Sequence, residues 1–248
     1  MSGWRGRLVG YTVSAYIVGD VMVDTGFPGV RGELMRAIES IGPRGSIVTH
    51  WHEDHAGNVP ELAARGFPMA MHAECEAILR QHPRIRAYRR FVWSRPEKLT
   101  SPVVPFDPAP LRIIATPGHC DDHIAVWDAE RRILIGGDLF LGVKVRMAHA
   151  HESLSALIRS LRTVAALEPR VLLDAHRGPL VNPTGLLLAK VQWLEETIGQ
   201  IKALHDEGAG EREITHRILG AELFVGLVSF GEYSKRSFVR AAISCRRP

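Results

Sequence analysis

The alternation of apolar and polar residues in the first half of the chain predicts short strands separated by glycine and proline. Two helical patterns interrupt these strands, one over residues 31–41 with Leu34, Ile38 and Ile41 on one face, the other near 56–65. The polar stretch 128–132 lies between two β-rich runs and predicts a hairpin turn. The expected strands lie in the segments 10–18, 20–27, 45–51, 67–73, 111–118 and 123–138.

The second half of the chain has a helical period. Its first pattern predicts an amphipathic helix that ends before Pro169, and its apolar positions are Leu154, Leu157, Ile158, Leu161, Val164 and Ala165. One further strand is expected at 170–176, then a long helix from about 184 to 207 and shorter helical segments at 211–219 and 234–243. We expect a mixed α/β chain forming one domain over 1–248, with 184–248 as a helical C-terminal extension packed on it.

Length and composition favour a compact intracellular protein. The chain has 248 residues, of which 46% are hydrophobic and 23% charged, so it can bury a large core. The N-terminal residues lack the apolar core of a signal peptide, and no run reaches the roughly 20 apolar residues of a membrane span. Three cysteines, Cys75, Cys120 and Cys245, are far apart and form no CxxC pair, which argues against a disulfide framework. We therefore expect a soluble cytoplasmic protein without membrane contacts.

A basic and aromatic cluster stands out from the modest net charge of +4. In "RIRAYRRFVW", residues 84–93, four arginines flank three aromatic residues. Such interleaving can bind single-stranded nucleic acid. The favoured alternative is a solvated helix face whose aromatic side chains pack inward, so nucleic acid is not the expected partner.

The stretch "IVTHWHEDHAGN", residues 47–58, is rich in metal-binding side chains. His50 and His52 are two residues apart where the chain leaves a predicted strand, so they point to the same side. Asp54 and His55 follow where the chain turns into a helix. Imidazoles with a carboxylate and no cysteine suit Zn, Fe or Mn better than Ca or Mg.

Three later segments bring further candidate ligands to the ends of apolar strands. They are "ATPGHCDDH" with His119, "LIGGDLF" with Asp138, and "LLDAHRG" with His176. Together with the earlier cluster, these donors exceed what one tetrahedral ion takes, but they suit two ions that share a carboxylate.

These motifs, in this order, resemble the metallo-β-lactamase-fold hydrolase superfamily over residues 12 to 178. The resemblance implies a four-layer αββα sandwich, here with additional C-terminal helices. It implies a first metal held by His50, His52 and His119, and a second held by Asp54, His55 and His176, with Asp138 as the bridge. It also suggests Asp24, in "VMVDTG", as a group that supports the ligands, although a turn-capping role fits that residue equally well.

The resemblance also implies a reaction class. Two divalent ions, most readily Zn with Fe or Mn as alternatives, would activate water against an ester, thioester or lactone carbonyl of a small-molecule substrate, with Asp54 as ligand and proton relay. Many true β-lactamases of this fold place a cysteine where this chain has Asp138, whereas glyoxalase-II-like thioesterases and lactonases have the aspartate. Open alternatives are a mononuclear iron persulfide dioxygenase, a metal-binding protein without turnover, and a phosphodiesterase or nuclease. The oligomeric state stays open, with a homodimer as one option.

Some residues near these motifs have two interpretations. Cys120 beside His119 is redox active if exposed, but a buried spectator thiol is favoured. His123 competes with His119 as a ligand, and a local hydrogen bond is the favoured role for it. His149 and His151 either contact substrate or precede a helix that Ser153 and Glu152 cap, and capping is the slightly favoured account. No substrate-binding residue is assigned.

Overall fold

The computed structural model describes residues 12–82 and 84–245. Contacts between Cα atoms divide the chain into two compact units. The first comprises the described parts of Met1–Ala115, Asp122–Asp138 and Arg170–Val181. The second comprises Thr116–Asp121, Leu139–Pro169 and the described part of Asn182–Pro248. The docking of residues 184–248 within a single domain stays a prediction.

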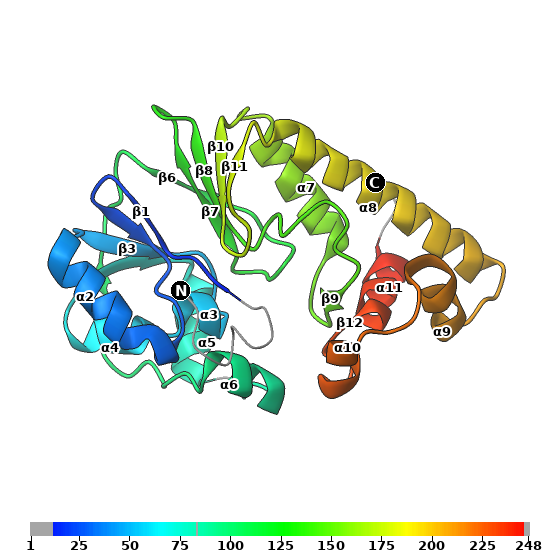
Figure 1. Ribbon diagram of the computed structural model, residues 1–248, viewed down its shortest axis with the longest axis horizontal. Helices are drawn as coiled ribbons and strands as arrows, with labels where there is room; N and C mark the ends of the chain where they lie inside the picture. Colours follow the sequence, from blue (N-terminus) through cyan, green and yellow to red (C-terminus); the bar gives the residue numbers. More distant parts are fainter. Residues whose placement is uncertain (1–11, 83, 246–248) are drawn as a thin grey trace. The chain divides into compact units, whose positions relative to one another are not determined.

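The first unit contains two five-stranded sheets (Figure 1). One sheet has the order β1-β2-β3-β4-β5, with strands at Tyr16–Val18, Val21–Val23, Gly45–Val48, Pro68–Met71 and Val104–Pro105. Strands β1 and β2 are antiparallel, and the three later pairs are parallel. Parallel neighbours need crossover connections, and helices provide them here.

The first unit also contains a 3₁₀ turn and several helices. They are the 3₁₀ turn η1 and helices α2 to α6, at Pro28–Val30, Arg31–Ile41, Glu53–Ala56, Val59–Ala64, Ala73–Gln81 and Ala87–Trp93. Leu34 of α2 is buried in a cluster with Met22, Val48 and Leu62, and Ile38 packs against it. The predicted helix at 31–41 is confirmed, but Ile41 is 57% exposed because it is the last residue, directly before the left-handed Gly42 cap. The second pattern, near 56–65, is split between α3 and α4.

The second sheet has the order β11-β10-β8-β7-β6. Its strands, β6, β7, β8, β10 and β11, lie at Arg112–Ala115, Ile124–Asp128, Ile133–Gly137, Val171–Asp174 and Gly178–Val181. Only β8 and β10 pair in parallel. The predicted hairpin joins β7 to β8, and Asp128 Oδ1 accepts a hydrogen bond from Arg131 N at 3.0 Å in its turn.

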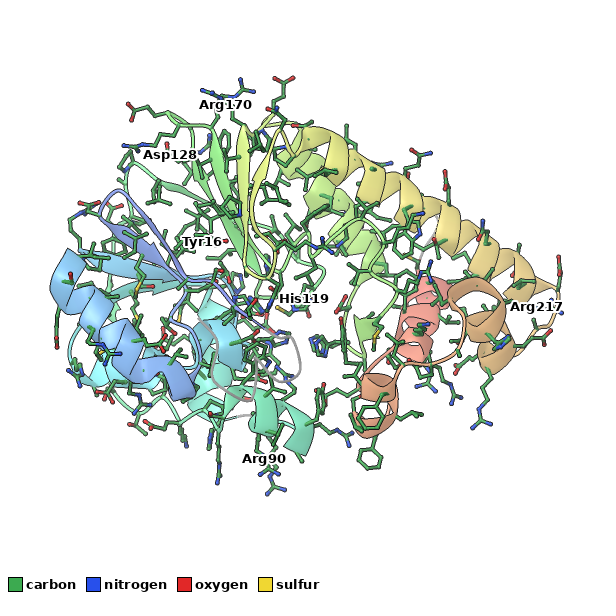
Figure 2. All side chains as sticks on the ribbon, viewed as in Figure 1. Tyr16, Arg90, His119, Asp128, Arg170 and Arg217 are labelled. Carbon is green, nitrogen blue, oxygen red and sulfur yellow. The ribbon has the colours of Figure 1, made fainter. Side chains whose placement is uncertain are left out.

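The core of the first unit includes apolar side chains from both sheets. Val21, Ile47, Val126 and Ile135 are fully or almost fully buried in one cluster. Tyr16 lies on β1 (Figure 2), and its hydroxyl donates to the backbone carbonyl of Asp174 on β10 at 2.7 Å, so a hydrogen bond also joins the sheets. Apolar burial of this kind is the dominant favourable term in folding.

The second unit is mainly helical. Its helices α7, α8, α9, η2, α10 and α11 span Leu154–Ala165, Thr184–Asp206, Glu211–Ile214, Thr215–Leu219, Phe224–Val228 and Lys235–Ser244, and η2 is π-helical. Strands β9, at Ala148–His149, and β12, at Tyr233–Ser234, form a small antiparallel sheet. Helices α7 and α8 lie side by side (Figure 1).

The predicted helices of the second half are confirmed. All six apolar positions named for the first helix are buried in α7, and Ser153 caps it by accepting from the Ala156 N–H at 3.4 Å. The long helix ends at Asp206, close to the predicted position 207. In the described residues, no helix combines the length and the apolar character needed to cross a membrane.

Candidate metal centre

The metal-binding motif forms a strand–turn–helix segment of the first unit. Strand β3 ends at Val48, and His50 and His52 are buried directly after it. The His52 carbonyl accepts from the backbone N–H groups of His55 and Ala56 at 3.0 and 2.8 Å, so His52 is the N-cap of α3. The turn thereby places Asp54 and His55 in the first turn of the helix, and both side chains are buried.

Four side chains of this unit converge at one point. Nε2 of His55 and Nε2 of His176 each lie 3.2 Å from Asp138 Oδ1. Asp54 Oδ2 lies 3.7 and 3.5 Å from the same two nitrogens. Asp138 follows β8 and His176 follows β10, so the parallel pairing of these strands brings the two residues together. The ligand atoms of Asp54, His55 and His176 all lie within 4.8 Å of one another.

His50, His52 and Asp138 belong to a second group with the same spacing, 4.8 Å or less between ligand atoms. The rings of His50 and His52 meet edge to face, with centroids 4.6 Å apart, and the rings of His50 and His55 lie 4.1 Å apart. The two groups therefore adjoin. Every predicted ligand of the first unit has a place in one of them.

Hydrogen bonds at Nδ1 orient two of these histidines. His55 Nδ1 lies 2.8 Å from Asp24 Oδ2, and His176 Nδ1 lies 2.6 Å from the Thr12 carbonyl oxygen. Because a carbonyl oxygen only accepts, His176 carries a proton on Nδ1 and directs Nε2 toward Asp138. Metal-binding histidines in proteins generally have such a carboxylate or carbonyl partner on the other ring nitrogen.

The position of Asp24 bears on its two interpretations. Its backbone has a φ of 66°, and its carboxylate accepts from Thr49 N at 2.7 Å and Thr49 Oγ1 at 2.9 Å, besides contacting His55. The side chain is thus tied both to the end of β3 and to a candidate ligand. This geometry favours support of the ligands over a simple turn cap, and the role stays a prediction.

Nearby carboxylates change the pKa values of the His55 and His176 imidazoles. Burial opposes protonation of His55, but Asp138, Asp54 and Asp24 outweigh it and raise the pKa of that imidazole well above 6.5. The same competition, dominated by Asp138, raises the pKa of His176 to about 9. Burial disfavours the Asp138 carboxylate, yet the neighbouring His176 and His55 hold its pKa well below 3.8. A metal ion must therefore displace protons to bind here.

Stability of the metal-free protein is expected to fall as pH rises above neutrality. The folded-state pKa of His176 is raised from 6.5 to about 9, so its contribution is full below about pH 6.5 and is lost as pH passes through about 9. Asp138 contributes above pH 3.8, because its pKa is depressed. Urea unfolding with chelator at pH 6, 7.5 and 9 measures the effect, which reaches about 3 kcal/mol for His176 alone.

The matched control for this pH effect is His176→Gln, which removes one titrating group and should reduce the loss of stability between pH 6 and 9. An equal pH dependence in both proteins would contradict the assignment. Metal added in excess should also reduce the dependence, because it replaces the protons.

A buried ion pair beside the motif was missed in the sequence. Arg89 of α6 donates from Nε and Nη2 to the two carboxylate oxygens of Glu53 at 2.6 and 2.5 Å, and both side chains are buried. The guanidinium also lies 5.4 Å from the Trp51 ring centroid. Burial raises the pKa of Glu53, while Arg89 acts in the opposite direction. The expectation of a wholly solvated helix face is therefore wrong for Arg89, although Arg86 and Arg90 are exposed.

His119 belongs to the second unit, where it contacts Glu152 and His149. It is buried, its Nδ1 lies 3.3 Å from Glu152 Oε1, and its ring centroid is 5.7 Å from that of His149. Its place among the metal ligands stays a prediction. Cys120 next to it is buried, as the spectator interpretation expects.

His123 and the histidines before α7 have structural contacts. His123 is buried and its Nε2 accepts from the Asp138 backbone N–H at 3.1 Å, so its partner is not local but fifteen residues away. His149 N donates to Glu152 Oε1 at 2.9 Å, and Ser153 caps α7 as expected, while substrate contact by His149 or His151 is untested. The rings of His149 and His151 stack with centroids 5.3 Å apart.

Comparison with known proteins identifies the family. The family model described as the metallo-beta-lactamase superfamily matches residues 8–176. This chain belongs to the metallo-beta-lactamase superfamily. A solved structure of another metallo-beta-lactamase family protein, from Thermus thermophilus, superposes with a TM-score of 0.65 at 20% identity, over 90% of this chain and 82% of that one. The predicted metallo-β-lactamase fold is thus confirmed.

Curated members of the superfamily match part of the chain. The lactamase-like protein nscB of Trichophyton rubrum is 30% identical over 154 residues, which is 60% of this chain and 41% of the relative. An atrochrysone carboxyl ACP thioesterase of Aspergillus fumigatus is 28% identical over 190 residues, 73% of this chain and 56% of the relative. This chain therefore spans about half the length of these two relatives.

Proposed function

We propose that this superfamily member is a metal-dependent hydrolase that uses a dinuclear site against an ester, thioester or lactone carbonyl, with a thioester as the leading substrate. The observation that carries the proposal is the convergence of Asp54, His55, Asp138 and His176 on one point. We further propose that His50, His52, His119 and Asp138 form the other ligand group.

The donors fit divalent metal ions. Imidazole nitrogens and carboxylate oxygens without cysteine suit Zn, Fe or Mn, and Zn is the ion we propose first. The hydrogen bonds of His55 to Asp24 and of His176 to Thr12 leave Nε2 of each ring directed at the carboxylates, as a ligand requires. Asp138 lies 3.2 Å from His55 and His176 and also belongs to the group of His50 and His52, so it would be a ligand available to both proposed ions.

Two ions bound at these residues would lower the pKa of water and polarise the scissile carbonyl oxygen. The chain supplies the remaining functions. Asp24 holds His55 in one orientation through a 2.8 Å contact. Asp54, whose Oδ2 lies between His55 and His176, is placed to take a proton from water and deliver it to the leaving group.

Support for a thioester comes from two directions. Asp138 stands where many true β-lactamases of the fold have a cysteine, and the aspartate is typical of the thioesterase-like and lactonase-like members that the sequence resembles. The relative in Aspergillus fumigatus is named a thioesterase, and 73% of this chain matches it. The other substrates considered, persulfide with one iron and phosphodiesters, have no such named support among these relatives.

The first test is elemental analysis by plasma mass spectrometry on freshly purified, tag-free protein. We expect about two ions per chain, because seven donors exceed the needs of one ion. Metal removal by chelator should abolish thioester hydrolysis, and added Zn or Mn should restore it. A panel of thioesters, lactones and phosphodiesters then identifies the substrate class.

Some results of that test would contradict the proposal. A single iron with oxygen-dependent turnover of a persulfide would replace the hydrolase with a dioxygenase. A protein that binds metal but hydrolyses no member of the panel would favour a binding role.

A further inference from the structure

A basic pocket lies on the first unit, beside helix α6. Its volume is about 540 Å³, and it is lined by His82, Arg84, Ile85, Arg90, Arg95 and Pro96. Figure 2 shows Arg90 at α6, projecting away from the sheets of this unit. The size falls within the roughly 300–1,000 Å³ of small-molecule sites.

The charges of this pocket are not neutralised within the described residues. Its lining has three arginines and no carboxylate. No ion pair to a described residue is formed by Arg84, Arg90 or Arg95. Other arginines of the unit do pair, as Arg65 does with Glu61.

The nearest acid along the chain is engaged elsewhere. Glu97 follows the pocket residues Arg95 and Pro96, and its carboxylate accepts from Arg31 at 2.9 Å. Three guanidinium groups around one hollow repel one another, and an anion there would relieve that repulsion.

Hydrogen bonds hold the frame of the pocket in place. His82 Nε2 donates to the Pro96 carbonyl at 3.0 Å, which joins the residue after α5 to the segment after α6. Leu99 N donates to Leu79 O at 3.2 Å close by. On the neighbouring position of α6, Arg89 is anchored to the buried Glu53. Arg90, next to Arg89 in α6, therefore extends from an anchored helix.

We propose that this pocket binds the phosphate groups of a soluble phosphorylated molecule, of the size of a nucleoside diphosphate. The planar guanidinium matches phosphate oxygens with paired donors, which makes arginine a preferred residue for this recognition. Ile85 and Pro96 offer apolar surface to the organic part of the ligand. Single-stranded nucleic acid is usually bound by stacking its bases on aromatic side chains, and among the described lining residues only His82 has an aromatic ring.

The test is calorimetric titration of the full chain, as purified with its metal, with pyrophosphate and with ADP. Arg90→Gln should weaken binding by about tenfold or more, as expected for the loss of a hydrogen bond to a charged group. The triple variant Arg84→Gln, Arg90→Gln, Arg95→Gln should lose binding. Affinity should fall as salt rises, because the pocket is exposed.

Two control variants make the result specific. Arg36→Gln removes an exposed arginine of α2 that forms no ion pair with a described residue, and it should leave binding unchanged. Asp138→Ala alters the metal centre, and it should also retain ADP binding. Loss of binding in Asp138→Ala would place the phosphates at the metal and overturn the pocket proposal, as would equal affinity in Arg90→Gln and the parent. An oligonucleotide that displaces ADP, with affinity that rises with its length, would overturn it in favour of nucleic acid.

The phosphates can belong to the substrate or to a separate effector, and kinetics distinguishes these sources. If they belong to the substrate, Arg90→Gln raises KM for a thioester with a phosphate-bearing carrier and leaves KM for a phosphate-free thioester unchanged. If they belong to an effector, neither KM changes in Arg90→Gln although ADP binding is weakened. Both outcomes support phosphate binding in this pocket. Absence of hydrolysis with every substrate would count against the proposed function alone.

Discussion

Replacing Asp138 with alanine is expected to lower metal-dependent hydrolysis by about 10³-fold or more while leaving the fold largely intact. Its Oδ1 is 3.2 Å from Nε2 of both His55 and His176, and Asp138 also groups with His50 and His52, so one substitution removes a donor proposed for both metal ions. Stabilisation of a transition state by metal is worth several kcal/mol, and each 1.36 kcal/mol is a factor of ten in rate. Steady-state kinetics with metal analysis of the same sample measures both effects.

A suitable control for Asp138 is Asp128→Asn in the same sheet. Asp128 ends β7 and pairs with Arg131 in the hairpin turn, and Figure 2 shows it at the same end of the sheet as Arg170, which directly precedes β10. That variant should keep its metal and its turnover. His52→Ala should behave like Asp138→Ala. Full activity in His52→Ala or in Asp138→Ala would refute the assigned metal centre.

The second large effect concerns stability. Arg89→Ala is expected to destabilise the protein by about 3–5 kcal/mol, because it leaves the buried Glu53 carboxylate without its guanidinium partner. Glu53 stands between His52 and Asp54. Loss of the ion pair should therefore also loosen the turn between β3 and α3 and weaken metal retention. Urea unfolding and chelator competition measure the two consequences separately.

Two further variants separate charge from packing in this ion pair. Arg90→Ala changes the exposed neighbour and should alter the free energy of unfolding by less than about 0.5 kcal/mol. Replacing Glu53 and Arg89 together by methionine should recover much of the stability, since an apolar pair of similar volume avoids the desolvation cost. An Arg89→Ala protein as stable as Arg90→Ala would show that the buried pair contributes little.

The clustering of His50, His52, Asp54 and His55 could be predicted because its evidence is local. Two histidines at i and i+2 after an apolar strand, then an acid and a histidine at a helix start, define a short motif, and β3 and α3 form as that motif requires. Helix α7 was equally predictable, because its apolar period of three and four residues repeats over three turns.

The Glu53–Arg89 pair could not be predicted in the same way. Its members are 36 residues apart, and their contact depends on how α6 lies against the start of α3. Arg89 differs from Arg86 and Arg90 only in the direction of its side chain. The sequence alone does not show which arginine of such a run points inward. The hydrogen bond from Asp138 N to His123 likewise depends on tertiary structure, because it joins the residue before β7 to the residue after β8. His119 remains a prediction from the family pattern.

The hydrogen bonds that hold His176 have a practical consequence for protein production. Ser14 N donates to Ala175 O at 2.7 Å, Tyr16 Oη donates to Asp174 O, and the Thr12 carbonyl accepts from His176 Nδ1. The segment 12–16 thus fixes a residue more than 150 positions away. A deletion that reaches Thr12, or a fusion partner that pulls this segment from β10, would reorient the imidazole. Preparations that differ only in their N-terminal tag would then differ in metal content, which makes tag removal before metal analysis essential.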